Sequence, residues 1–143
     1  MEKFKMDLQL FAGEFAHGAT LTLGGGVGAV ANLTNIDGLD VSSDDLDVSD
    51  HNSTDGFREY IPGLIDGGEV PVEGNFNPTV AIAFYDAQVA RTVLTGCTLE
   101  FPDAATTTWT FDCYVKQVTT SAPHDDKLPF SATLKITGRP TLA

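Results

Sequence analysis

The sequence has few basic residues, and long stretches of it have none. Its 143 residues include 8 lysines and arginines against 20 aspartates and glutamates, so the formal net charge is -12. Arg58 is the only lysine or arginine between Lys5 and Arg91. Because nucleic-acid affinity depends on neutralising phosphates with such residues, this composition excludes a protein that binds DNA or RNA tightly.

Long apolar runs are also missing. The opening MEKFKMDLQLFAGEF carries two lysines as a signal peptide does, but Asp7, Gln9 and Glu14 interrupt its apolar run. No segment approaches the ~20 apolar residues of a membrane-spanning helix. We therefore expect a soluble protein that is made in the cytoplasm and is not inserted in a membrane.

Motifs of catalysis and metal binding are absent as well. HExxH, CxxC, GxSxG and GK[ST] do not occur, and His17, His51 and His124 lie far apart in the sequence. The acids form no isolated pair in an apolar setting, which general acid–base catalysis requires. We expect no enzyme, no cofactor and no dedicated metal site.

Two stretches imitate binding motifs. Gly24, Gly26 and Ala29 have the G-x-G-x-x-A spacing of a dinucleotide loop, but the residues that follow do not favour a helix, so we interpret them as a turn between strands. From Asp50 the pattern resembles a calcium loop with its glycine misplaced and Ile61 where the glutamate belongs. Only opportunistic divalent binding is compatible with that pattern.

Alternation of apolar and polar residues predicts a mainly β protein. It runs through residues 97–101, 109–118 and 130–136, and EVPVEGNF places alternate residues on one face as well. These patterns indicate half-buried antiparallel strands. The predicted core positions on them are Val70, Val72, Phe76, Cys97, Leu99, Phe101, Trp109, Phe111, Cys113, Val115, Phe130, Ala132, Leu134 and Ile136. The fold class is an antiparallel β-sandwich or barrel.

One helix is predicted, over about 78–91. Asn77 is a good N-cap and Pro78 suits the first helical position. Val80, Phe84 and Ala87 follow at helical spacing, so this helix should pack its apolar stripe on a sheet.

The two cysteines depend on how the strands pair. If residues 95–101 and 109–118 form a hairpin centred on Ala105, Cys97 and Cys113 lie opposite each other on the core face. A disulfide is then possible in geometry, but in a cytoplasmic protein we expect two buried free thiols.

The chain divides into three parts by pattern. Residues 1–16 are expected to form an N-terminal arm, residues 17–137 a single β domain with a long loop at about 40–66, and residues 138–143 a C-terminal tail. Neither end shows sustained alternation.

A contiguous quarter of the chain resembles a known family. VSSDDLDVSDHNSTDGFREYIPGLIDGGEVPVEGNFNP is similar to a segment of the major tail tube proteins of long-tailed bacteriophages. The matching pieces are Asp47–His51, Asp55-Gly56, Phe57–Leu64, Asp66–Glu69 and Glu73–Phe76. The opening MEKFKMDLQLFA also resembles the first residues of structural proteins in phages of Gram-positive hosts.

The resemblance implies a structural virion protein located in the tail and assembled in the host cytoplasm. Such proteins form hexameric rings that stack into a hollow tube, through which genomic DNA passes without specific binding. Their implied partners are further copies of the same chain and the tail tip initiator, tape measure and tail terminator proteins. A negatively charged wall would let DNA slide through.

The long loop at 40–66 and the N-terminal arm are the expected contacts between copies. Arg58 is a candidate partner for an aspartate of another subunit; a local pair with Glu59, Glu69 or Glu73 is the alternative. The candidate interface residues are Asp50, His51, Asp55, Phe57, Arg58, Glu59, Tyr60, Phe4, Leu8 and Phe11. Two other functions stay open: a monomeric acidic β-sandwich module that binds Ca²⁺ or a ligand, and a head–tail connector or contractile-type injection tube protein of the same fold.

Overall fold

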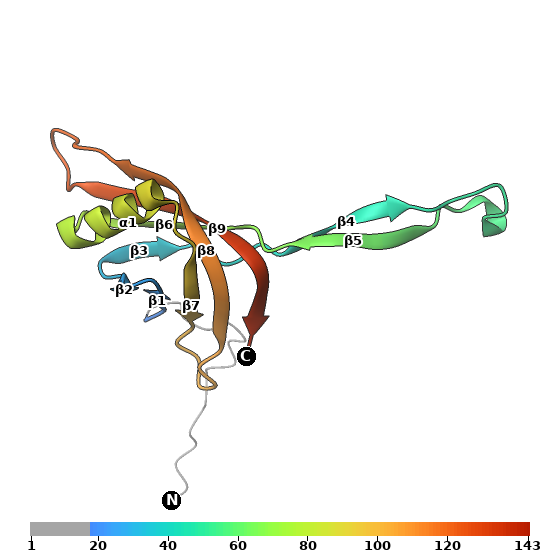
Figure 1. Cartoon of the computed structure of the whole chain (residues 1–143), viewed down its shortest axis with the longest axis horizontal. Helices are drawn as coiled ribbons and strands as arrows, with labels where there is room; N and C mark the ends of the chain where they lie inside the picture. The colour runs from blue at the N-terminus through green and yellow to red at the C-terminus, as the bar shows by residue number, and fades with distance from the viewer. Residues whose placement is uncertain (1–17) are drawn as a thin grey trace, which may run out of the picture.

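The computed structural model describes residues 18–143, which form a curled antiparallel sheet, one helix and a long projecting hairpin (Figure 1). The main sheet has seven strands in the order β2-β1-β7-β8-β9-β6-β3. Its strands are β1 (Thr20–Leu23), β2 (Gly28–Ala29), β3 (Leu33–Ile36), β6 (Glu69–Asn75), β7 (Leu94–Glu100), β8 (Thr108–Thr120) and β9 (Pro129–Leu142). The mainly β fold with one helix is confirmed. The predicted arm over residues 1–16, with Phe4, Leu8 and Phe11, lies outside the described residues.

β8 and β9 are the longest strands and pair with each other along the middle of the sheet. Their alternate residues are buried as predicted, from Phe111 to Val115 on β8 and from Phe130 to Ile136 on β9. β9 continues to Leu142, which pairs with Trp109, so the prediction of a tail over residues 138–143 is wrong in its secondary structure. Gly138 and Pro140 break the side-chain pattern there, but the backbone of β8 still offers hydrogen-bonding partners.

The predicted helix is present as α1 (Pro78–Ala90). The Asn77 side chain accepts a hydrogen bond from the Thr79 N–H at 3.1 Å, and Pro78 occupies the first turn, where a missing N–H costs nothing. The helix ends at Arg91, whose backbone is left-handed with φ 54°. α1 packs against β8 with Phe84 fully buried, as its apolar spacing predicts.

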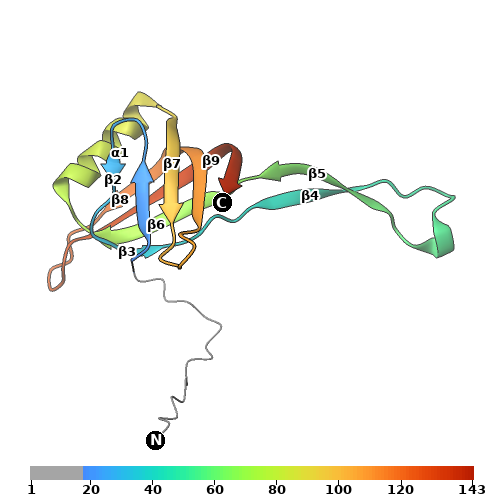
Figure 2. The same ribbon diagram turned by 90° about the horizontal axis from the view of Figure 1, so that it is seen from below.

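The core lies between α1 and the concave face of the curled sheet (Figures 1 and 2). Phe84 meets Phe130 edge to face with their ring centroids 5.6 Å apart. No polar or charged residue is buried among residues 18–143, so this core is purely apolar. Burying each large side chain contributes about 1.5–3 kcal/mol.

The cysteines are free thiols, but the predicted pairing is wrong in register. Cys97 lies opposite Phe111 because the hairpin is centred on Ala104 and not on Ala105, and an irregularity between Leu94 and Cys97 then places Cys113 opposite Leu94. Gly96 has φ 69° there and donates its N–H to the Asp112 carboxylate at 3.0 Å. Both thiols are nonetheless buried, with their Sγ atoms 3.6 Å apart.

The thiols share one hydrogen bond, and this separates their acidities. Donation from the Cys113 thiol lowers the pKa of Cys97 to about 7, and the Gly24 N–H adds to this effect. Cys113 donates its thiol proton to Cys97. This hydrogen bond and the burial of the thiol both raise the pKa of Cys113. The pair is a core feature, since neither sulfur reaches solvent.

The dinucleotide-like glycines form the turn between β1 and β2, as interpreted from the sequence. Gly25, Gly26 and Gly28 all have positive φ, which favours glycine. Phe76 differs from its prediction. It follows the end of β6 and is 36% exposed, although its N–H still bonds to the Leu128 carbonyl in the register of β6 and β9.

Candidate assembly surface

Residues predicted as a long loop form a second, separate sheet of two strands. β4 (Ser42–Asp47) and β5 (Tyr60–Asp66) pair antiparallel, with Leu46 opposite Ile61 and Asp47 opposite Tyr60. From here on, "the arm" means residues 42–66 and not the N-terminal segment 1–16. It projects far from the main sheet in both views (Figures 1 and 2). The loop prediction is therefore corrected to a hairpin.

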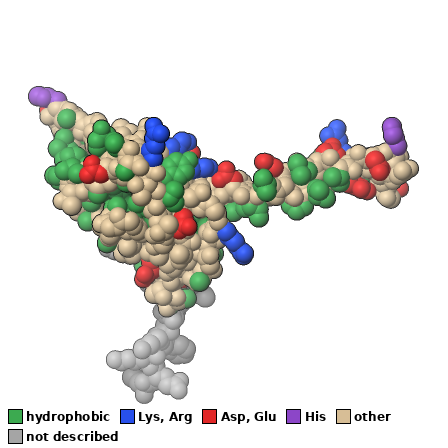
Figure 3. Space-filling model, in the orientation of Figure 1, with side chains coloured by type: hydrophobic (Ala, Val, Ile, Leu, Met, Phe, Trp, Pro, Cys, Tyr) green, Lys and Arg blue, Asp and Glu red, His purple; other side chains and the backbone are tan. Residues whose placement is uncertain are grey.

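The arm has no core of its own. No residue from 41 to 66 is buried, because both faces of a two-stranded ribbon lie in solvent. Large apolar side chains nevertheless line it, as Figure 3 shows along its length. They are Leu46, Val48, Phe57, Tyr60, Ile61, Leu64 and Ile65, with Val41 exposed just before the arm. An isolated hairpin is marginally stable at best in water, so these side chains need another surface to cover them.

The outer end of the arm is held by short local hydrogen bonds. The Asp50 carboxylate accepts the Asn52 N–H at 2.7 Å, and the Ser53 hydroxyl accepts the Asp50 N–H at 3.0 Å. A single turn of 3-10 helix, η1 (Thr54–Gly56), follows, in which Asp55 has φ 57°. Such bonds order the turn without burying it. We call residues 50–57 the tip.

Arg58 is close to an acid of its own chain. Its guanidinium lies 3.8 Å from the Asp47 carboxylate, and its side chain is 75% exposed. The pKa of Asp47 is lowered by hydrogen bonds from the Ser49 hydroxyl and backbone N–H. The charged form of the Asp47 carboxylate is therefore stabilised by Ser49 and does not depend on Arg58. The local partner is thus Asp47 and not Glu59, Glu69 or Glu73, and the contact is loose enough for Arg58 to find another partner.

The structure brings the predicted residues of the arm together. Asp50, His51, Asp55, Phe57, Arg58, Glu59 and Tyr60 all lie in its outer part and are all exposed. Acidic side chains gather around this end (Figure 3). Their role as contacts between copies stays a prediction.

Sequence reasoning missed a second apolar surface on α1. Ile82, Tyr85 and Val89 recur at helical spacing on the outer side of the helix and are each 60% exposed or more. We call the main sheet and α1 together the body. Val93 and Tyr114 are further exposed apolar residues of the body. The signal was present in the sequence, because TVAIAFYDAQVA is apolar nearly all round, which marks a helix covered on both sides.

Two other features were sought among the described residues, a metal cluster and a membrane-spanning helix. Within residues 18–143, no group of three or more histidine, cysteine, aspartate or glutamate side chains is placed to hold a metal ion. None of the helices in that range is long and apolar enough to cross a membrane.

Comparisons with known proteins agree on the fold. No protein-family model and no curated protein matches the sequence. Among solved structures, a chain from the virion of a native gene transfer agent particle is similar with a TM-score of 0.77 and 13% identity, over 92% of this chain and 99% of that chain. A chain from the tail of an empty gene transfer agent particle with C6 symmetry has a TM-score of 0.76 and 14% identity, over 92% and 99%.

A third similar chain comes from the sheath-tube complex of an extracellular contractile injection system. Its TM-score is 0.69 at 15% identity, over 94% of this chain and 93% of that chain. This chain therefore shares the fold of those chains, and the mainly β fold expected from the sequence resemblance is confirmed.

Proposed function

We propose that this chain is a structural, non-enzymatic virion protein that self-assembles into stacked rings and forms a phage tail tube. The arm is the observation that carries the proposal. The body has a buried apolar core of its own. The arm projects from it as a separate two-stranded sheet, and its large apolar side chains are all exposed. Exposed apolar surface of this extent marks a protein interface, and the similar chains come from tails and injection tubes.

The rings are proposed to be hexameric, as the C6 symmetry of one similar tail suggests. The main sheet ends in the short edge strands β2 and β3, which can pair with neighbouring subunits around a ring. Head-to-tail contacts of this kind close into a ring and leave both ring faces free to stack. The tail tip initiator, tape measure and tail terminator are the further proposed partners.

The convex face of the sheet suits the lumen of such a tube. Along β8 and β9 it presents Thr110, Asp112 and Thr133, which alternate with the buried residues. Its two lysines are occupied: Lys116 bonds to Glu69, and Lys135 lies 3.1 Å from Asp66. With these two lysines paired to acids, this part of the face offers little hold on phosphates, so DNA can pass without binding.

Electron microscopy of the purified chain tests the proposal. Negative-stain images of concentrated protein should show rings or tubes, and the symmetry of end-on rings should be six. A chain that stays monomeric in size-exclusion chromatography at the highest concentrations contradicts self-assembly. It would favour the monomeric binding module instead.

A second candidate is the tube of a contractile particle. The exposed row Ile82, Tyr85 and Val89 on α1 favours it, because a sheath subunit could cover that row. Thiol labelling of Val89→Cys in assembled tubes separates the two. A reactive thiol leaves the row open for a sheath, whereas a protected thiol places it between tube subunits.

A further inference from the structure

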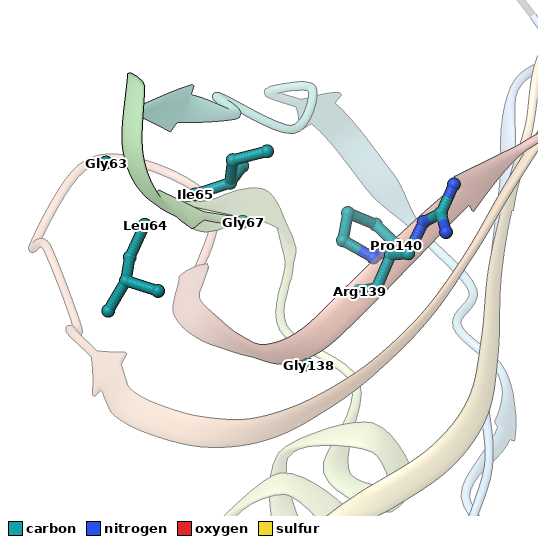
Figure 4. Close-up of a pocket in the computed structure, with 7 residues that line it drawn as sticks. All are labelled: Gly63, Leu64, Ile65, Gly67, Gly138, Arg139 and Pro140. Atoms are coloured by element: carbon teal, nitrogen blue, oxygen red, sulfur yellow. The ribbon is translucent and has the colours of Figure 1, made fainter. Parts of the chain in front are cut away.

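A groove opens where the arm joins the body. It has a volume of about 610 Å³, and we call it the base groove. Figure 4 shows β5 on one side of it and β9 on the other. Its lining includes Gly63, Leu64, Ile65, Gly138, Arg139 and Pro140. In the described residues, β6 pairs with β9 only as far as Lys135, and the Ile136 N–H makes one further bond to the Gly68 carbonyl. From Thr137 on, β9 pairs with β8 alone and its other edge borders the groove.

The chemistry of the base groove is apolar with one positive charge. Leu64 is 90% exposed and Ile65 is 71% exposed, although both are large aliphatic residues. Arg139 has no carboxylate within 4.0 Å among residues 18–143. A complementary ligand therefore needs an apolar group and a neighbouring acid.

The tip of the arm offers that combination. Phe57 is 76% exposed at the end of the turn, and Asp50 and Asp55 precede it. The local hydrogen bonds of Asp50 hold the turn in shape, which lowers the entropy lost on docking. The tip is thus an aromatic protrusion with acids beside it.

Tip and groove cannot meet within one chain. Residues 57 and 64 lie at opposite ends of the same extended segment, about 23 Å apart at 3.3 Å per residue. A contact between them must join two copies. Because it uses two different surfaces, it is heterologous and can repeat from copy to copy.

We propose that the tip of each arm docks in the base groove of a second copy. Phe57 packs against Leu64, Ile65 and Pro140, while Asp55 approaches Arg139. This inference rests on the proposed self-assembly and names the surface that receives the arm. The arms then follow one another tip to base through the assembly.

Cysteine cross-linking tests the contact. Phe57→Cys and Leu64→Cys in one chain should give a ladder of disulfide-linked multimers under mild oxidation, because a disulfide needs Cα atoms about 4.4–6.8 Å apart. The single variants should give at most dimers. The matched control joins Phe57→Cys to Val89→Cys on α1, which is also exposed, and should give no ladder. A ladder only from the α1 pair would overturn the inference.

A double-mutant cycle tests the charge pair. Arg139→Gln and Asp55→Asn, which tolerates the positive φ of residue 55, should each raise the concentration needed for assembly about tenfold. The double variant should be no worse than either single variant, since both remove one interaction. Arg91→Gln with Asp55→Asn should instead be additive.

The outcomes separate this inference from the proposed function. A wild-type chain that assembles, with no 57–64 ladder and additive effects at residues 55 and 139, overturns the docking site and leaves the tube intact. A wild-type chain that never assembles contradicts both.

Discussion

The body and the arm are both built from antiparallel strands, but only the strands of the body bury an apolar face. In the body, sixteen apolar residues from Leu21 to Ile136 are 0–8% exposed, and α1 closes the curled sheet over them. In the arm, strands of similar length bury nothing. The buried residues of the body supply the free energy of folding, whereas the arm carries exposed apolar surface that another copy would cover in the proposed assembly. Substitutions in the two regions should therefore affect different measurements.

Phe84→Ala should have the largest effect on folding. It empties the centre of the core between α1 and Phe130, so the free energy of unfolding should fall by about 3–5 kcal/mol. Urea denaturation of the monomer measures it. Leu46→Ala in the arm is the matched control, and an equal loss there would break the distinction between the two regions.

Asn77→Ala should have an intermediate effect. The variant removes the side-chain acceptor of the Thr79 N–H and should cost about 1 kcal/mol. Asn77→Ser should restore most of the loss, because serine caps as well. If Asn77→Ala leaves the urea midpoint unchanged, the cap does not stabilise α1.

The Asp103 carboxylate should add a small pH dependence to the body. Hydrogen bonds from the Thr107 hydroxyl and backbone N–H lower the pKa of Asp103. A lowered folded-state pKa stabilises the fold above the ordinary value of about 4, and this stabilisation is lost as the pH falls through the folded pKa. Thermal melts between pH 7 and 3 should show a shallower decline for Asp103→Asn than for wild type. Equal slopes would contradict the assignment.

Arg58→Ala should have the smallest effect on the monomer. Its ion pair with Asp47 is exposed, and such pairs contribute little. We expect an unchanged unfolding midpoint but weaker ring or tube formation in sedimentation assays. Arg91→Ala is the control at another exposed arginine. Normal assembly of Arg58→Ala would show that Arg58 is no contact between subunits.

The body could be predicted from sequence because burial imposes a pattern. Alternation revealed β8 and most of β9, and Asn77-Pro78 marked the start of α1. Prediction failed where backbone pairing continues without burial, as in the last residues of β9. It also failed at the turn of the β7–β8 hairpin, which is centred on Ala104 and not on Ala105, and at the irregularity near Gly96; together they change which residues lie opposite the cysteines.

The strands of the arm were also missed in the prediction from sequence. Its serines and aspartates indicated a loop, because neither strand has a buried face to impose a period of two. The outer residues around Arg58 were predicted as contacts only through the resemblance, and that role stays a prediction. Leu64, Ile65 and the outer row of α1 were missed, since an exposed apolar residue gives the same sequence signal as a buried one.

Shortening the arm tests the central claim most directly. Replacing residues 44–64 by Asn-Gly joins the paired Ser43 and Ile65 through a two-residue turn and leaves the body unchanged. We predict that this variant folds with the urea midpoint of the wild-type monomer and forms no tubes in electron micrographs at any concentration. Tubes of normal appearance from the shortened chain would contradict the assignment of the arm to assembly.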